Sequence, residues 1–479
     1  MSPRSRRALL RAFGVGAAGL VAGCPDGGAD STDEHAGTPT GDPSSPSMTV
    51  DQPVETPTVS LGETTGTQGD EETSTETETA TETETETVAE TETSKPPTGE
   101  ALDPGLGPRP DQTWPLPDRS VTNDAYAPES VAFERSPAVE WTIEATDPTE
   151  TSHYDPRFTT PLVADGQVYV VNELLYGPNV ERPDQQYLRA YDQADGTEDW
   201  TYEFSDEGSG EAPTPTLPAV RDRVVYVGTH QTLHAVDRAE GSVLWARSFD
   251  DRLLTLHPTT EYTYVVAYDR LVALDDSGAT VWERDLFDVA LAAPALGLRS
   301  LYVGTSGRHI HAFDPATGEE RWDRRVQDPT EGDQGGWAVR NVVATAGGVL
   351  ANRAGGFVYA FDERGELVWT ADGTDGALTT DGSRVFSGAA EGRIQALDVP
   401  GGDGRWNRAY DGTGKFEDMV LADGVLYAAS PYGSTSSVVA IDPEGGAERW
   451  RYEGDVDNLA LDDETVYAVE DDTLLRALR

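Results

Sequence analysis

Histidine and cysteine, which often bind transition-metal ions, are scarce in this sequence. The chain has seven histidines and a single cysteine, Cys24. Two histidine pairs have a spacing at which both imidazoles could reach one metal ion: His230 with His234, and His309 with His311. However, His234 and His311 occupy the same position of an internal repeat, directly before an alanine, and other copies have Arg, Val, Tyr or Gln there. Such variation is typical of a strand face, so the sequence predicts no metal site.

Known catalytic motifs are also missing from the sequence. It has no Gly-x-Ser-x-Gly nucleophile elbow, no zinc signature and no phosphate-binding loop. The acidic clusters at 372–375 and 462–464 lack the alternating Asp-x-Asp-x-Asp-Gly spacing of a calcium loop. We interpret these clusters as solvated turns. No catalytic residue is therefore predicted.

The charge of the chain excludes one class of function. Its formal net charge is -51, from 86 acidic and 35 basic residues, whereas a nucleic-acid-binding protein needs a basic face. Residues 1–24 contribute +4, residues 25–103 contribute -19 and residues 104–479 contribute -36. This acidity, with almost no lysine, resembles that of proteins from extreme halophiles, whose carboxylates stay hydrated in concentrated salt. The alternative is an acidic surface with a specific partner.

The N-terminus has the features of an export signal. Arg6 and Arg7 precede an apolar run over 12–23, which is too short to span a bilayer and ends in Val-Ala-Gly before Cys24. The arginine pair resembles a twin-arginine signal, and the last four residues resemble a lipobox, in which the cysteine is lipidated. We therefore expect 1–24 to be a twin-arginine lipoprotein signal and Cys24 to anchor the chain to membrane lipid at the outer face of the cell membrane. A buried structural thiol is the alternative for Cys24.

The composition of residues 25–110 predicts a disordered, acidic tether. Threonine alternates with glutamate over much of 71–92, and the segment has almost no apolar side chain whose burial could offset the entropy of ordering. Repulsion between like charges should keep it extended.

The remainder of the chain contains a repeat that occurs seven times. Each copy has Ala-x-Asp, then a glycine, then a tryptophan four residues after the glycine, as in Ala312, Asp314, Gly318 and Trp322. Only the distance between Asp and Gly varies. We interpret this part as a hairpin turn between two strands of fixed register, because a change of loop length leaves the flanking pairing intact. Aspartate can accept hydrogen bonds from the turn backbone, and glycine can adopt the positive φ that such turns need.

Each repeat predicts one blade of a propeller. Further apolar strands precede the Ala-x-Asp strand, as at 165–170 and 423–427, which makes four short antiparallel strands in about 40 residues. The eighth copy stops at Arg479 before its tryptophan strand, while an unattached tryptophan strand lies at 139–143. We therefore predict an all-β, eight-bladed β-propeller over 111–479, with four-stranded antiparallel blades, in which the N-terminal strand closes the last blade.

These residues resemble the PQQ-like repeat of propeller proteins, whose signature Ala-x-Asp-x-x-Thr-Gly-x-x-x-Trp is complete at 312–322. Propellers of this type are found in quinoprotein dehydrogenases and in the lipoprotein of outer-membrane assembly machinery. The resemblance implies that eight tryptophans lie between neighbouring blades and dock them: Trp141, Trp200, Trp245, Trp282, Trp322, Trp369, Trp406 and Trp450.

The resemblance leaves two functions open. A quinoprotein dehydrogenase implies a disulfide between adjacent cysteines, a calcium ion and an aspartate base, but no cysteine follows Cys24. Binding of the quinone PQQ is therefore not expected, and no cofactor is predicted. The leading hypothesis is a monomeric, non-catalytic propeller, anchored by lipid outside the cytoplasm, that binds or scaffolds an unidentified protein. The alternative is an oxidoreductase that uses PQQ or another cofactor at an atypical site.

Loop lengths indicate where a partner would bind. The connections between the second and third strands of a blade, and between one blade and the next, contain most of the insertions, and both emerge on one face. Variable loops on a rigid scaffold often carry function. Four aromatic residues of the polar loops are candidates for the binding face: Tyr176, Tyr187, Trp337 and Tyr432. The alternative is that the insertions are merely tolerated.

Overall fold

The computed structural model describes residues 102, 116, 120, 122–128, 130, 132–146, 156–174, 185–204, 216–327, 338–353, 356–372, 376–389, 392–431 and 434–479. The expected export signal, with Arg6, Arg7 and Cys24, and nearly all of the expected tether lie outside these residues. Within the described ranges, no helix has the length and apolar character needed to cross a membrane.

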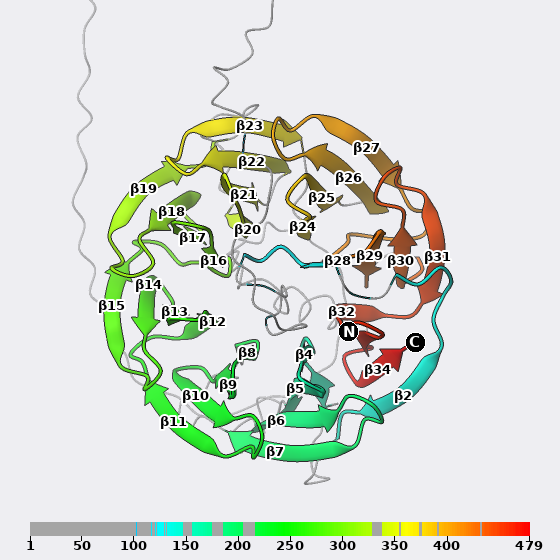
Figure 1. Ribbon diagram of the computed structural model, residues 1–479, viewed down its shortest axis with the longest axis horizontal. Helices are drawn as coiled ribbons and strands as arrows, with labels where there is room; N and C mark the ends of the chain where they lie inside the picture. Colours follow the sequence, from blue (N-terminus) through cyan, green and yellow to red (C-terminus); the bar gives the residue numbers. More distant parts are fainter. Residues whose placement is uncertain are drawn as a thin grey trace, which may run out of the picture. The chain divides into compact units, whose positions relative to one another are not determined.

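Eight β-sheets are arranged in a ring, one sheet per blade (Figure 1). The strands of each blade are designated A to D from the centre of the ring outward. In blades 1 to 7 they follow one another in the chain as an antiparallel meander. The predicted all-β, eight-bladed propeller is confirmed.

Blades 1 to 4 have the following strands. Blade 1 contains β4 (Leu162–Ala164), β5 (Gln167–Leu174), β6 (Gln185–Asp192) and β7 (Glu198–Phe204), and blade 2 contains β8 (Ala219–Arg221), β9 (Val224–Gly228), β10 (Thr232–Asp237) and β11 (Val243–Ser248). Blade 3 contains β12 (Leu253–Pro258), β13 (Thr263–Ala267), β14 (Arg270–Leu274) and β15 (Thr280–Asp285), and blade 4 contains β16 (Ala295–Leu296), β17 (Leu301–Gly304), β18 (His309–Phe313) and β19 (Glu320–Arg325). The inner strand of blade 1 is divided, because β3 (Arg157–Phe158) also pairs with β5.

Blades 5 to 8 follow the same plan. Blade 5 contains β20 (Val339–Thr345), β21 (Gly348–Arg353), β22 (Phe357–Asp362) and β23 (Leu367–Asp372), and blade 6 contains β24 (Leu378–Thr380), β25 (Arg384–Ala389), β26 (Arg393–Asp398) and β27 (Gly404–Ala409). Blade 7 contains β28 (Asp418–Ala422), β29 (Val425–Ser430), β30 (Ser437–Ile441) and β31 (Glu448–Glu453). Blade 8 contains β32 (Val456–Leu461), β33 (Val466–Glu470), β34 (Leu474–Leu478) and, as its outermost strand, β2 (Val139–Glu144).

The ring is closed by β2, as the sequence predicted. It pairs antiparallel with β34, with Trp141 opposite Ala477, and Figure 1 shows the N-terminal strand beside the C-terminal one. Two further backbone hydrogen bonds join Ala138 to Arg479, at 2.8 and 2.9 Å. The closure pairs the outer edge of β34, which would otherwise be a free sheet edge next to the first blade.

A segment that precedes β2 lies along the inner side of four blades. It includes β1 (Tyr126–Ala127), which pairs in parallel with the inner strand β28 of blade 7. Before it, the Asn123 amide donates to the backbone oxygens of Ala293, Pro294 and Val342, at 3.0 to 3.2 Å. The Thr379 hydroxyl of blade 6 donates to the Asp124 backbone oxygen at 2.7 Å. These contacts hold the segment against the inner strands of blades 4 to 7.

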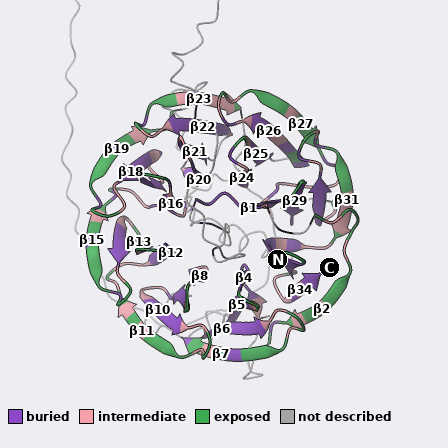
Figure 2. Ribbon diagram, in the orientation of Figure 1, coloured by how far each residue is buried: buried purple, intermediate pink, exposed green. Residues whose placement is uncertain are grey.

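The apolar core lies between neighbouring blades. Phe386 and Ile394 of blade 6, for example, belong to one buried cluster with Leu426 and Val439 of blade 7. Inner and middle strands are buried, whereas the outermost strands present alternate residues to solvent (Figure 2). Because the blades pack face to face, each blade is stabilised by its two neighbours.

Candidate interaction face

Seven of the eight tryptophans contact the following blade, and the eighth, Trp450, contacts the segment that precedes β2. In blade 3, the indole Nε1 of Trp282 donates to the backbone oxygen of Pro315, in the C–D turn of blade 4, at 3.0 Å. The ring lies against Gly318, whose φ is +66° and where a Cβ would come within 2.5 Å of the ring. The other indoles donate to Gln193 (Trp141, 3.2 Å), Arg238 (Trp200, 2.8 Å), Asp276 (Trp245, 3.0 Å), Glu363 (Trp322, 3.0 Å), Val399 (Trp369, 2.7 Å), Pro443 (Trp406, 2.9 Å) and Phe133 (Trp450, 2.7 Å).

The remaining repeat residues build the turn that receives the tryptophan. Asp314 Oδ1 accepts hydrogen bonds from the backbone of Ala316 and Thr317, both at 3.0 Å, which fixes the C–D turn. Ala312 is fully buried and lies opposite Trp322, and a bulge follows it directly. The repeat motif is thus accounted for by packing between blades.

Of the four aromatic residues predicted for the binding face, the structure describes one. Tyr176, Trp337 and Tyr432 lie outside the described residues. Tyr187 belongs to β6, rather than to a loop as expected, and only 6% of its surface is exposed. The hairpin strands β5 and β6 extend further than their sequence indicated, and the Arg189 guanidinium lies 5.6 Å from the Tyr187 ring centroid.

Two other aromatic side chains are exposed on the same face, in blade 3. Tyr268 is in the B–C turn and is 48% exposed, and Phe287 is in the connection to blade 4 and is 89% exposed. Their φ angles are +56° and +62°, a left-handed conformation that bulky residues rarely adopt. Neither residue was identified from the sequence, because the turn at Tyr268 and the connection at Phe287 contain no residue type that indicates a positive φ.

Backbone hydrogen bonds place these two loops side by side. The Leu286 amide donates to the Asp269 oxygen at 2.7 Å, and the Ala290 amide donates to the Tyr268 oxygen at 3.2 Å. Tyr268 and Phe287 therefore flank one contact between a turn and a connection. Strained backbone is found at binding surfaces as well as in tight turns, so these two exposed aromatic residues make this face a candidate interaction site.

The surroundings of this aromatic pair are acidic. Aspartates of the loops on this face of blade 3 and its connections are Asp250, Asp251, Asp269 and Asp288, and Asp285 ends strand β15 beside them. Arg270 lies among them but is engaged, since it pairs with Asp251 at 2.6 Å and with Glu283 at 2.8 Å. The side chain of Asp250 is 97% exposed. The face thus combines apolar contact area with a local excess of negative charge, which favours a cationic partner.

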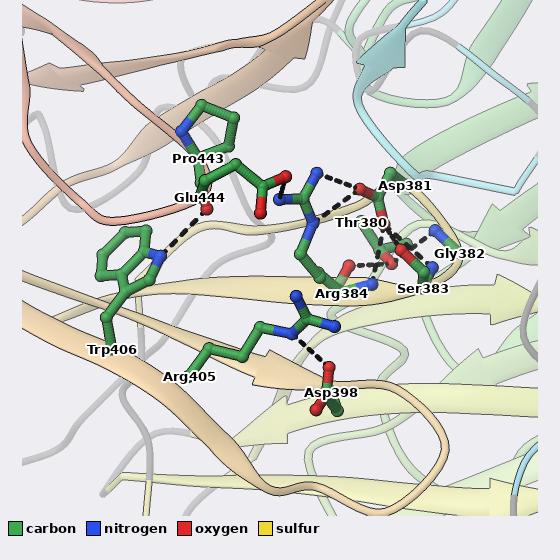
Figure 3. Close-up of polar contacts among 10 residues, drawn as sticks. All are labelled: Thr380, Asp381, Gly382, Ser383, Arg384, Asp398, Arg405, Trp406, Pro443 and Glu444. Atoms are coloured by element: carbon green, nitrogen blue, oxygen red, sulfur yellow. Dashed lines mark hydrogen bonds and ion pairs between the residues drawn. The ribbon is translucent and has the colours of Figure 1, made fainter.

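The opposite face has a pocket of about 280 Å³ between blades 6 and 7. Arg384 lies in it and pairs with Asp381 at 2.7 Å and with Glu444 at 2.6 Å (Figure 3). Burial raises the pKa of Asp381, but hydrogen bonds from the backbone and side chain of Arg384 outweigh it and lower this pKa below its ordinary value. Arg384 thus joins both carboxylates in an ion-pair network between blades, an arrangement that supplies neither a free base nor a free nucleophile.

Comparison with known proteins matches almost all of the propeller. The family described as PQQ_2, outer membrane protein assembly factor BamB, matches residues 103–253, 229–371 and 354–478. An outer membrane protein assembly factor BamB from Yersinia pestis is 27% identical over 259 residues, which are 47% of this chain and 63% of that protein. A quinohemoprotein alcohol dehydrogenase from Comamonas testosteroni is 25% identical over 282 residues, which are 53% of this chain but 34% of that enzyme.

Solved structures agree in fold. BamB from Moraxella catarrhalis has a TM-score of 0.54 at 19% identity, covering 72% of this chain and 99% of that one. The quinohemoprotein alcohol dehydrogenase from Comamonas testosteroni has a TM-score of 0.58 at 13% identity, covering 76% of this chain and 80% of that one. At these identities the likeness shows the propeller alone, which hosts both an assembly factor and an enzyme.

Proposed function

Because the chain belongs to the PQQ_2 family, described as outer membrane protein assembly factor BamB, we propose that it is a non-catalytic propeller that binds or scaffolds a protein partner outside the cytoplasm. The sequence features at Arg6, Arg7 and Cys24 support export and a lipid anchor at the outer face of the cell membrane. The acidic tether would give the propeller reach from that anchor.

One observation carries this proposal: the exposed pair Tyr268 and Phe287, on left-handed backbone. Burial of an 89%-exposed phenylalanine beside a tyrosine offers the aromatic anchors that dominate many protein interfaces. The acidic loops around the pair favour a partner segment in which basic residues flank an apolar one. Tyr176, Trp337 and Tyr432 are further candidates for contacts on this face.

The oxidoreductase alternative has less support. The only cysteine is Cys24, so the adjacent-cysteine disulfide of quinoprotein dehydrogenases cannot form. The chain's own segment around Asn123 and Tyr126 lies against the inner side of blades 4 to 7. Since these residues do not fit a quinone site of that type, we derive no reaction through PQQ.

Affinity capture with paired variants tests the proposal. Tyr268→Ser with Phe287→Ser should lose partners that the wild-type protein retains. The matched control is Leu298→Ser, which removes a 60%-exposed apolar side chain from the A–B turn of blade 4, on the opposite face. Equal loss in both variants would contradict a role for the blade 3 face. Tight binding of added PQQ and calcium, with dye reduction, would instead favour the oxidoreductase.

A further inference from the structure

The structure brings together a group of side chains that the sequence did not unite. His309 and His311 alternate on strand β18, so both project from the same side of the sheet, and their ring centroids are 5.8 Å apart. Asp323 on β19 lies directly opposite His311 in the antiparallel register and therefore projects from that side too. One potential ligand atom from each of these three residues lies within 4.8 Å of the other two.

We propose that His309, His311 and Asp323 form a binding site for a divalent transition-metal ion such as Zn²⁺. Two imidazoles and a carboxylate are a ligand set that Zn²⁺ accepts, whereas Ca²⁺ and Mg²⁺ prefer oxygen alone. Because His309 and Asp323 are partly exposed, with side-chain exposures of 29% and 39%, a water molecule can occupy a fourth position.

The distances require little rearrangement. Asp323 Oδ1 lies 2.7 Å from His309 Nδ1 and 3.9 Å from His311 Nδ1. Metal bonds of about 2.1 Å in a tetrahedral site place neighbouring ligand atoms about 3.4 Å apart, which falls between these two values. Rotation of the carboxylate can therefore make room for an ion between the two rings.

The surroundings favour such an ion over a simple ion pair. In blade 1, Arg189 occupies the position of His311 and pairs with Glu198 at 3.1 Å, just as His311 Nδ1 contacts Glu320 Oε1 at 2.8 Å. Opposite Arg189 stands Thr201, whereas opposite His311 stands a second carboxylate. His311 is only 6% exposed, and an ion bound at its Nδ1 atom would replace the present contact with Glu320.

Zn²⁺ titration of the full-length protein, freed of metal with a chelator, tests the site. Calorimetry should find one Zn²⁺ equivalent that binds at least tenfold more weakly in His309→Ala, His311→Ala and Asp323→Asn. Zn²⁺ should also raise the melting temperature of the wild type but not of these variants. Substitution by Co²⁺ should give visible absorption that the variants lose.

His234→Ala is the matched control. His234 occupies the same repeat position on β10, but Ala246 lies opposite it instead of an aspartate. This variant should bind Zn²⁺ as the wild type does. The proposal is overturned if the wild type shows no saturable binding, or if all variants bind equally, since the many other carboxylates would then account for it. Melting without metal identifies any variant that fails to fold, and Asp323→Asn, which preserves side-chain size, keeps the test decisive.

Discussion

The indole Nε1 of Trp450 donates a 2.7 Å hydrogen bond to the backbone oxygen of Phe133, which lies 317 residues earlier in the chain. Every other repeat tryptophan donates to the C–D turn of the following blade. Blade 8 has no such turn, because β34 ends near Arg479 and β2 comes from the other end of the chain. The segment at Phe133 takes the place of the missing turn. Its backbone amide also donates to the Tyr427 hydroxyl at 2.9 Å.

Loss of the indole N–H at this junction should destabilise the ring. We expect Trp450→Phe to lower the free energy of unfolding by about 1 kcal/mol, since it leaves the Phe133 oxygen without this donor. Trp450→Ala should cost about 3–5 kcal/mol, because it also leaves a cavity. Denaturant unfolding measures both. Trp369→Phe, at a junction where the indole contacts a C–D turn, is the control. A loss of unfolding free energy far smaller in Trp450→Phe than in Trp369→Phe would show that the Phe133 segment does not replace a turn.

Contact between tryptophan and glycine should limit substitution in the C–D turns. Gly318→Ala places a Cβ within 2.5 Å of the Trp282 ring, whereas Gly424→Ala meets no atom within 4 Å. Both glycines have positive φ, +66° and +71°, so the backbone strain is shared. We expect Gly318→Ala to be less stable than Gly424→Ala by about 1–3 kcal/mol, the usual effect of overpacking. Thermal or denaturant unfolding of the pair is the measurement, and equal losses would rule out a packing role for the contact.

Buried tyrosines should make the fold sensitive to alkali. Burial raises the pKa of Tyr427 to about 12 and raises the pKa values of Tyr169, Tyr264, Tyr302 and Tyr467, which occupy the same position in other blades. The unfolded chain loses these protons at about pH 10. It therefore binds fewer protons than the folded chain above that pH, so stability is complete below pH 10 and falls as pH rises toward 12.

Spectrophotometric titration of tyrosinate, together with unfolding at each pH, checks this expectation. Tyr427→Phe should flatten the pH dependence slightly. Blade 6 already has Phe386 at the equivalent position, so the ring itself is compatible with the site. Tyrosines that titrate normally in the folded protein would contradict the predicted burial effect.

The left-handed backbone at the exposed aromatic residues should lower the stability of the fold, while their side chains contribute to partner binding. We expect Phe287→Gly to raise the free energy of unfolding by about 1 kcal/mol, because glycine adopts the positive φ without a steric penalty, while partner binding falls. Asp222→Gly, at φ +51° in the A–B turn of blade 2, should stabilise the protein without affecting binding. If Phe287→Gly retains full binding, the exposed ring is not a contact.

Low ionic strength should weaken the fold. Residues 104–479 contribute -36 to the net charge, and the repulsion among their carboxylates is screened only by salt. The melting temperature should therefore rise steadily with KCl concentration into the molar range. A melting temperature that does not depend on salt would contradict the interpretation of the composition as an adaptation to concentrated salt.

The sequence alone determined the propeller, because the repeat that defines each blade depends on residues that lie close together in the chain. The spacing of Ala312, Asp314, Gly318 and Trp322 reflects a hairpin whose turn chemistry and alternation depend only on neighbouring residues. The unpaired strand at 139–143 and the incomplete repeat at Arg479 also sufficed to predict the closure that β2 makes.

Only the tertiary structure decided which side chains became available for function. The exposure and left-handed φ of Tyr268 and Phe287 follow from contacts between a turn and a connection, and no residue type in those loops signals them. The group formed by His309, His311 and Asp323 depends on the cross-strand register. The replacement of a turn by the segment at Phe133 requires the closed ring, since pairing between distant segments is set by mutual burial and not by local preference.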